Sequence, residues 1–387
     1  MEKIQKNIGN IGKVGIAAIM LMSSLTVMVG NAITPAIPEI GQVYNLGSFA
    51  SWLVTAPALG VVVTAIFFGK MIDKKGPYII ALIGLLCYGI FGVIGAFMPN
   101  VILLFLDRFL LGAATAAIMS ASYALIAGFF KGEKQLKIIA LQGMSMEFGG
   151  VIFLSFSGFL ANTSWQGPFF IYGFAFLALL MLVTSVPKKC LYLSKEENGD
   201  GLPEKPVPVP LILLAAFLGM LMFFTAMVSL PMYLQNDLGY TPAFTGYYLA
   251  GLDLVAALAG GLMPQVVKAL GTRGCLTLAF TCYGLAFLLY WVSATPLVLI
   301  FAAMFVGLGM GLSTPLFSNL VLNNSRPERK GQNASFCTMA MFAGQFMSAL
   351  LVSLLPSHTL FITSFIMAIV VGFSVFSIGG KYIIKKI

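Results

Sequence analysis

Three ionisable side chains stand inside long apolar stretches, where they could bind a proton or a charged cargo. They are Glu147 in "SMEFGG", Arg108 in "LFLDRFLLG" and Asp253 in "AGLDLVAA". A charged group surrounded by hydrocarbon is costly unless it is paired, protonated or hydrated. These three residues are therefore the first candidates for chemistry, and the elements that carry them decide what that chemistry is.

The composition predicts that those elements are membrane helices. Of the 387 residues, 59% are hydrophobic and 9% are charged, against about 25% charged in average soluble domains. The apolar residues come in runs of about 20, the length that a helix needs to cross a bilayer. We expect an all-α membrane protein with a retained first helix and twelve spans, which begin near Val14, Phe49, Tyr78, Val101, Ile138, Gly167, Leu211, Thr241, Cys275, Pro296, Asn333 and Leu360.

The basic residues predict the orientation. All but one of the 22 Lys and Arg residues fall on the same side of this twelve-span arrangement, the exception being Arg108. Positive residues stay in the cytoplasm, so we expect both termini inside a cell membrane. The net charge of +9 then reports topology and not a nucleic-acid partner. No Cys or His spacing indicates a metal or cofactor, and His358 is expected on an external surface.

One long polar segment divides the chain. Residues 187–210 combine charge with closely spaced Pro and predict a solvated linker. The expected order is a cytoplasmic N-terminus (1–13), a six-helix bundle (14–186), the linker (187–210), a second six-helix bundle (211–380) and a cytoplasmic tail (381–387). The two halves echo each other, since Gly69 and Gly261 are 192 residues apart, and Lys131 and Arg326 are 195 apart. Such duplication is typical of secondary transporters, which bind cargo between the repeats.

Several motifs resemble the major facilitator superfamily. After span two, Gly69, Asp73, Lys74 and Gly76 match its G-x-x-x-D-[RK]-x-G pattern, and span four carries its R-x-x-x-G element as Arg108 to Gly112. The glycines near the first motif are expected to allow a sharp cytoplasmic turn. The resemblance implies two six-helix bundles that work by alternating access, with Asp73 in a conformational clasp on the cytoplasmic side.

Two external segments resemble the drug:proton antiporter branch of that family, "YLQNDLGYTPAFTGYYLAG" and "SGFLANTSWQGPFF". The span-five signature of that branch departs here, because Phe153 and Leu154 replace its central Gly-Pro. The acid often seen in span one of the larger antiporters is replaced by Asn31. The resemblance covers the whole chain for the fold and is partial for antiport.

The depths of Arg108 and Glu147 are similar. At 1.5 Å per residue, Arg108 lies about 12 Å from the outer end of its span and Glu147 about 15 Å from the inner end. Asp107 is about 100° away from Arg108 around the helix, so we expect it on another face. Glu147 either forms a static salt bridge with Arg108, or is a carboxyl group that takes up and releases a proton as Arg108 or water approaches.

Glu147 and Asp253 each share a helix face with small residues. Stripes of mostly small or polar side chains accompany Glu147 and Asp253 along their helices and predict that both face the bundle interior. With both acids ionised and Arg108 positive, the membrane midplane carries one negative charge, which favours cationic or neutral cargo. Further candidates for the cargo cavity, chosen by polarity and position, are Asn31, Thr225, Tyr247, Tyr248 and Gln345.

We therefore predict a monomeric transporter in the lipid bilayer that exports lipophilic or cationic small molecules in exchange for protons. Glu147 is the predicted proton site, Arg108 its tuning partner and Asp253 a second acid. The alternative within transport is uptake or facilitated transport of a polar nutrient or organic anion that Arg108 contacts. A membrane-embedded enzyme is disfavoured, because the spans lack a histidine or a nucleophile with its base. A channel or receptor stays open.

Overall fold

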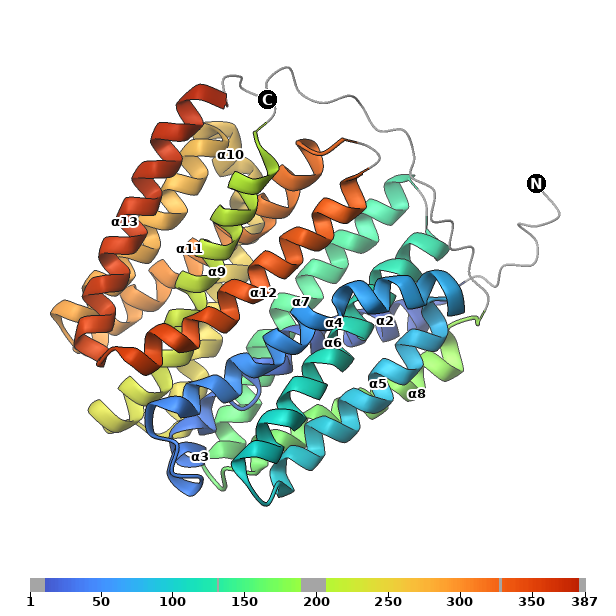
Figure 1. Ribbon diagram of the computed structural model, residues 1–387, viewed down its shortest axis with the longest axis horizontal. Helices are drawn as coiled ribbons and strands as arrows, with labels where there is room; N and C mark the ends of the chain where they lie inside the picture. The colour runs from blue at the N-terminus through green and yellow to red at the C-terminus, as the bar shows by residue number, and fades with distance from the viewer. Residues whose placement is uncertain (1–10, 131, 189–206, 327–328, 383–387) are drawn as a thin grey trace. The chain divides into compact units, whose positions relative to one another are not determined.

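The structure is a computed structural model, and it describes residues 11–130, 132–188, 207–326 and 329–382. Every regular element in these ranges is helical (Figure 1). The chain divides into two compact units, an N-terminal unit of Met1–Ala36 with Ala56–Lys195 and a C-terminal unit of Ile37–Thr55 with Glu196–Ile387. Most of the predicted linker and part of the predicted tail fall outside the described residues.

In its described residues, the N-terminal unit is built from six long helices and three short 3-10 helices. The long helices are α2 (Lys13–Asn31), α4 (Trp52–Lys75, whose first turn belongs to the C-terminal unit), α5 (Pro77–Ile94), α6 (Val101–Phe129), α7 (Gly132–Ala161) and α8 (Phe174–Ser185). The 3-10 helices are η1 (Thr34–Ala36), η3 (Gly95–Phe97) and η4 (Gly167–Gly173). Within this unit α2 packs against α6, α7 and α8, and α5 against α6 and α8.

The described part of the C-terminal unit contains five long helices and three short elements. The long helices are α9 (Val209–Met232), α10 (Pro242–Val292), α11 (Pro296–Asn323), α12 (Lys330–Leu354) and α13 (Ser357–Tyr382). The short elements are α3 (Ile37–Val43), the 3-10 helix η2 (Gly47–Ser51) and the π-helical turn η5 (Tyr233–Asp237). The sequence did not predict α3 and η2, which pack against α9 and α12 respectively.

The prediction of an all-α membrane protein is confirmed. Among the described residues, 11 helical segments are long and apolar enough to cross a bilayer. One of them, α10, is 51 residues long and contains Gly271 at φ 72° and ψ 169°, a non-helical conformation that separates two helices. Counting α10 as two spans gives the predicted twelve, and the predicted starts at Thr241 and Cys275 lie on either side of this break.

One backbone feature recurs at the spacing that the predicted duplication requires. Gly76 (φ 82°, ψ 153°) precedes α5 as Gly271 precedes the second half of α10, and the two glycines are 195 residues apart. Both occupy the left-handed region that favours glycine. The sequence had paired Gly69 with Gly261, but Gly69 lies inside α4 and not in the turn. The turn after span two depends on Gly76, followed by Pro77 at the first helical position.

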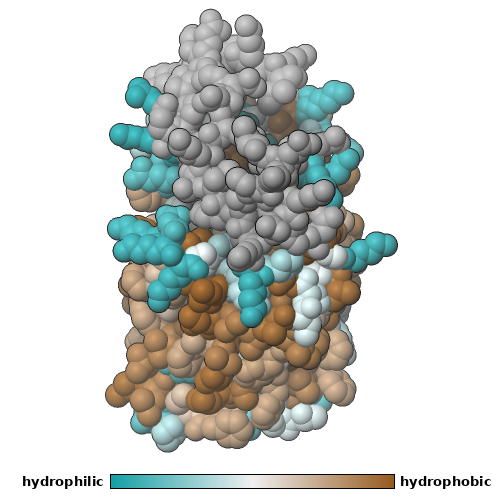
Figure 2. All heavy atoms as spheres, turned by 90° about the vertical axis from the view of Figure 1, so that its right-hand side faces the viewer, coloured by the Kyte–Doolittle hydropathy of each residue, from teal (hydrophilic) through white to brown (hydrophobic). Residues whose placement is uncertain are grey.

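The outward faces of the helices are apolar. On α5 the exposed side chains recur every three or four residues, at Ile79, Ile83, Leu86, Ile90 and Ile94, which is one face of a helix. Figure 2 shows a broad apolar field on one face of the molecule, with hydrophilic side chains gathered at its borders. An apolar surface of this extent is typical of contact with the hydrocarbon of a lipid bilayer and is unfavourable in water.

Candidate functional site

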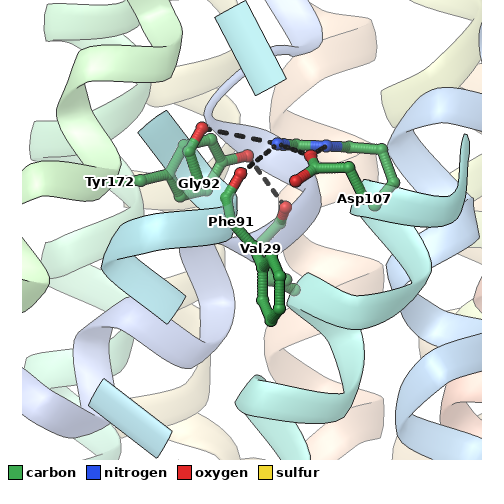
Figure 3. A network of polar contacts seen from close by, with 6 residues as sticks. Val29, Phe91, Gly92, Asp107 and Tyr172 are labelled. Atoms are coloured by element: carbon green, nitrogen blue, oxygen red, sulfur yellow. Dashed lines mark hydrogen bonds and ion pairs between the residues drawn. The ribbon is translucent and has the colours of Figure 1, made fainter. Parts of the chain in front are cut away.

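Arg108 is held in a buried network at one end of α5. The side chain of Asn100 accepts a hydrogen bond from the Leu103 amide at 2.9 Å and starts α6, which carries Arg108 two turns later. The Arg108 side chain is 0% exposed. Its Nη2 lies 2.6 Å from Asp107 Oδ2 and its Nε 3.1 Å from the same oxygen. Nη2 also donates to the carbonyls of Phe91 at 3.2 Å and Gly92 at 3.4 Å (Figure 3).

The expectation that Asp107 and Arg108 would occupy different faces is wrong. Adjacent Cβ atoms on a helix do point about 100° apart, but the arginine side chain is long enough to fold back over its own helix. The Asp107 side chain is also buried, with 3% of its surface exposed. Two opposite charges buried together offset each other's loss of hydration, and this outweighs the unfavourable starting directions.

Two aromatic rings of η4 lie against the guanidinium of Arg108. The guanidinium carbon of Arg108 lies 4.9 Å from the ring centroid of Phe169 and 5.2 Å from that of Tyr172, within the range of cation–π attraction. The Tyr172 hydroxyl donates to the Val29 carbonyl at 2.9 Å (Figure 3), and the Tyr88 hydroxyl to the Leu25 carbonyl at 2.6 Å. The two tyrosines thereby tie α2 to the helices that enclose Arg108.

Glu147 lies elsewhere on the N-terminal unit. Its side chain is half-buried on α7, and among the described residues no hydrogen bond or ion pair involves it, including any with Arg108. Gly143, one turn before it, is exposed, whereas Gly150, Leu154 and Ser157 are buried. The predicted stripe of small residues is therefore buried only toward the C-terminal end of α7. There the Ser157 hydroxyl donates to the Ala32 carbonyl.

Another face of α7 carries polar contacts that the sequence analysis did not single out. Gln142 is 1% exposed, and its Nε2 donates to Ser23 Oγ of α2 and Ser122 Oγ of α6, each at 2.9 Å. Ser145 Oγ donates to the Met20 carbonyl at 3.3 Å. An amide in an apolar run was a usable signal for Gln142, but its two partners come from helices distant in sequence.

In the C-terminal unit, some of the predicted site residues are buried and one is exposed. Asp253 on α10 is buried, with 4% of its surface exposed, as are Thr225 on α9 and Gln345 on α12. Tyr247 is 54% exposed. The Tyr248 hydroxyl lies 2.8 Å from the Tyr290 hydroxyl and donates to the Leu299 carbonyl at 2.6 Å. Tyr248 therefore joins α10 to α11, and its hydroxyl is already engaged.

The remaining predicted residues belong to the N-terminal unit. Asn31 is the last residue of α2, is 3% exposed, and its Oδ1 has no partner among the described residues. Asp73 and Lys74 are exposed in the last turn of α4. Within the described part of the chain Asp73 makes no hydrogen bond or ion pair. Gly112 is where α6 meets α4, since a Cβ there would lie 1.9 Å from the Pro57 carbonyl oxygen.

The family follows from comparison with known proteins. A family model described as Major Facilitator Superfamily matches residues 19–349 and 212–384. The chain belongs to the major facilitator superfamily. It is similar to an uncharacterized MFS-type transporter, YceJ of Bacillus subtilis (strain 168), with 25% identity over 81% of each chain. This membership identifies a membrane transporter, not an enzyme.

Relatives with named activities match a shorter part of this major facilitator. Multidrug resistance protein 2 of Bacillus subtilis (strain 168) is 28% identical over 40% of this chain and 38% of its own length. Quinolone resistance protein NorA of Staphylococcus aureus is 28% identical over 37% of this chain and 38% of its own length.

Solved transporters share the fold. A peptide transporter POT in complex with sulfate has a TM-score of 0.77 at 14% identity and covers 98% of both chains. An inward-facing, occupied bacterial homolog of the human lysosomal transporter Spinster has a TM-score of 0.75 at 14% identity, covering 96% of this chain and 97% of its own. At these identities the likeness concerns the fold alone.

Proposed function

We propose that this transporter exports lipophilic cations in exchange for protons, with Glu147 as the group that binds them alternately. The observation that carries this proposal is the isolation of Glu147, a mid-span carboxyl group that no described residue neutralises. A carboxyl group with a fixed cationic partner stays ionised, whereas one without a partner must acquire a proton or a cation when water leaves.

The charges of the N-terminal unit support this role. Arg108 and Asp107 neutralise each other at 2.6 Å, so their sum adds nothing to the electrostatics of the helix interiors. Glu147 then contributes one negative charge when ionised and none when protonated. A proton and a cationic cargo both neutralise the same group, and binding of either one removes the attraction for the other. Competition at one carboxyl group gives exchange when the carrier changes sides only with that group occupied.

The cargo class rests on three arguments of different kinds. Relatives named for multidrug and quinolone resistance share 28% identity over parts of this chain. The negative charge at Glu147 favours cations. The apolar character of the chain, with 59% hydrophobic residues, offers surfaces for lipophilic molecules. We include Asp253 as a second acid because it lies inside a span on a stripe of small residues. We include Asp73 as part of a cytoplasmic clasp because of its position in the family motif.

Arg108 supports the alternative function poorly. Uptake of an organic anion through Arg108 requires a guanidinium that a cargo can reach. This guanidinium is 0% exposed and already binds a carboxylate and two carbonyls. An anionic cargo would have to displace Asp107 from a buried site, which is expensive for both charges.

The test is cargo-driven proton movement in vesicles reconstituted with purified protein. The native chain would be compared with Glu147→Gln, which removes the charge at nearly constant size, using tetraphenylphosphonium as the lipophilic cation. Glu39→Gln is the matched control, because Glu39 is also half-buried but lies on the short helix α3 and not on α7. We expect native and control proteins to release protons on cargo addition, and Glu147→Gln to stay folded without releasing them.

Two results would contradict the proposal. Full proton release by Glu147→Gln would remove Glu147 from coupling and leave Asp253 as the acid to examine. Proton and cargo movement in the same direction would replace exchange with symport. Inside-out vesicles separate these directions, because an exporter then accumulates cargo in the lumen while protons leave.

A further inference from the structure

We propose that Asp107 and Arg108 form an electrically neutral cap on the C-terminal end of α5, and that Asp107 is the positioning residue that withholds the guanidinium from proton coupling. This inference rests on the proposed coupling role of Glu147. It replaces the tuning role that the sequence predicts for Arg108, and it assigns to Asp107 a role that no motif indicates.

The guanidinium sits where a helix end needs a cation. Helix α5 ends at Ile94, so the carbonyls of Phe91 and Gly92 lie in its last turn. The carbonyls of a last turn carry a negative partial charge and attract donors. Arg108 Nη2 donates to both of them, at 3.2 Å and 3.4 Å. The cation comes from α6, so the cap also fastens two helices together.

The backbone leaves space for the guanidinium. A Cβ added at Gly95, the residue after α5, would lie 2.2 Å from Arg108 Nη2 and 2.7 Å from the ring of Phe169. Any larger residue at this position would displace the side chain of Arg108. Gly92 likewise allows Tyr172 to approach, because a Cβ there would lie 2.2 Å from Tyr172 Cβ. The pocket therefore fits a planar cation between helix carbonyls and aromatic faces.

Asp107 supplies the charge that makes this burial tolerable. A guanidinium stays protonated under all ordinary conditions, so its positive charge needs an offset that does not leave. The α5 carbonyls and the rings carry only partial charges. Other titratable groups beside the pair are Tyr88 of α5 and Tyr172 of η4, and tyrosines are neutral near pH 7. Among the described residues, the carboxylate of Asp107 is the full negative charge within ion-pair distance of Arg108.

The pair is balanced in charge but incomplete in hydrogen bonds. Asp107 Oδ1 and Arg108 Nη1 are buried, and neither has a partner among the described residues. The pair therefore does not recover all the hydration that its two members lost. Removing one member leaves an uncompensated buried charge, whereas removing both charges together costs much less. Charge balance, more than the guanidinium itself, is what the site requires.

Three variants test this: Asp107→Asn, Arg108→Gln and the double variant with both changes. Folded yield would be measured by size-exclusion chromatography, and cargo-driven proton release would be recorded against pH in reconstituted vesicles. We expect each single variant to lose about tenfold or more in folded yield, because one buried charge is left alone. The double variant should recover most of that yield and release protons with the native pH profile.

A conservative variant keeps the test decisive if the double variant does not fold. Asp107→Glu retains the negative charge on a longer side chain, and it should also keep the native pH profile. A shift of about one pH unit in the pH profile of proton release by either folded variant would place the pair in the proton path and overturn the inference. Loss of proton release from a folded double variant would do the same. If the single variants fold as well as the native chain, the claim that folding requires this charge balance is wrong.

The outcome for Glu147→Gln is independent of these measurements. If that variant keeps its proton release, the proposed function fails whatever the pair does. If it loses proton release while the double variant keeps it, coupling depends on Glu147 and does not use Arg108. The two failures are thereby distinguishable in one set of vesicles.

Discussion

Replacing Gly112 with alanine should force α4 and α6 apart. A Cβ at this position would lie 1.9 Å from the carbonyl oxygen of Pro57, 2.6 Å from its carbonyl carbon and 2.7 Å from its Cα. Real Cβ contacts are essentially never shorter than 3.0 Å, so the backbones must separate by about 1 Å. Since all three obstacles are backbone atoms, no change of rotamer can relieve the clash.

The loss of stability can be estimated from the effect of adding methyl groups to well-packed protein cores. Extra methyl groups in well-packed cores cost about 1–3 kcal/mol when side chains can adjust. Here the adjustment must come from two helices, so we expect about 3 kcal/mol or more. Gly311→Ala, 199 residues later, should behave in the same way, because its Cβ would lie 2.2 Å from the Ala256 carbonyl oxygen.

The assay is thermal unfolding of purified protein in detergent. Gly143→Ala is the matched control, because Gly143 is also helical and no atom lies within 4 Å of its added Cβ. Alanine favours helix over glycine by about 1 kcal/mol, so the control should unfold at or slightly above the native temperature. We expect Gly112→Ala to unfold about 5 °C or more below it. If Gly112→Ala unfolds together with Gly143→Ala, the close approach of α4 and α6 is refuted.

Two further predictions follow from the fold and the orientation. Tyr172→Phe removes the hydroxyl that binds the Val29 carbonyl and should lower the unfolding free energy by about 1–3 kcal/mol; an unchanged melting curve would show that another donor takes its place. In a variant without native cysteines, Thr163→Cys, in the exposed segment after α7, should react with a membrane-impermeant maleimide in intact cells. Lys74→Cys should react only after the cells are permeabilised, and the reverse pattern would invert the topology.

Some properties of this protein follow from short stretches of sequence. A span is recognised from about 20 neighbouring residues, because hydropathy adds along the chain. The twelve predicted spans could therefore be located, including the two joined at Gly271 within α10. The break at Gly271 was not itself predicted, since a glycine shows that a left-handed backbone is permitted and not that it occurs.

The interaction partners of the buried polar and charged side chains could not be predicted from short stretches of sequence. Position along the sequence placed Arg108 and Glu147 at similar depths on consecutive spans, which made a contact between them one of two alternatives. In the structure Arg108 instead binds its neighbour Asp107 and the end of α5, while Gln142 binds serines of α2 and α6. Which helices are adjacent decides these contacts, and so does the reach of each side chain.

The sequence by itself thus determined the number of spans, the expected sidedness and the family, because each depends on local composition or on motif residues close together in the chain. Only the tertiary structure decided which acid neutralises Arg108 and that Glu147 has no such partner among the described residues. The physical reason is that Arg108 is buried against the last turn of α5, a segment distant in sequence, and in that position its side chain folds back onto the neighbouring Asp107. A contact between two helices of this kind cannot be read from either segment alone.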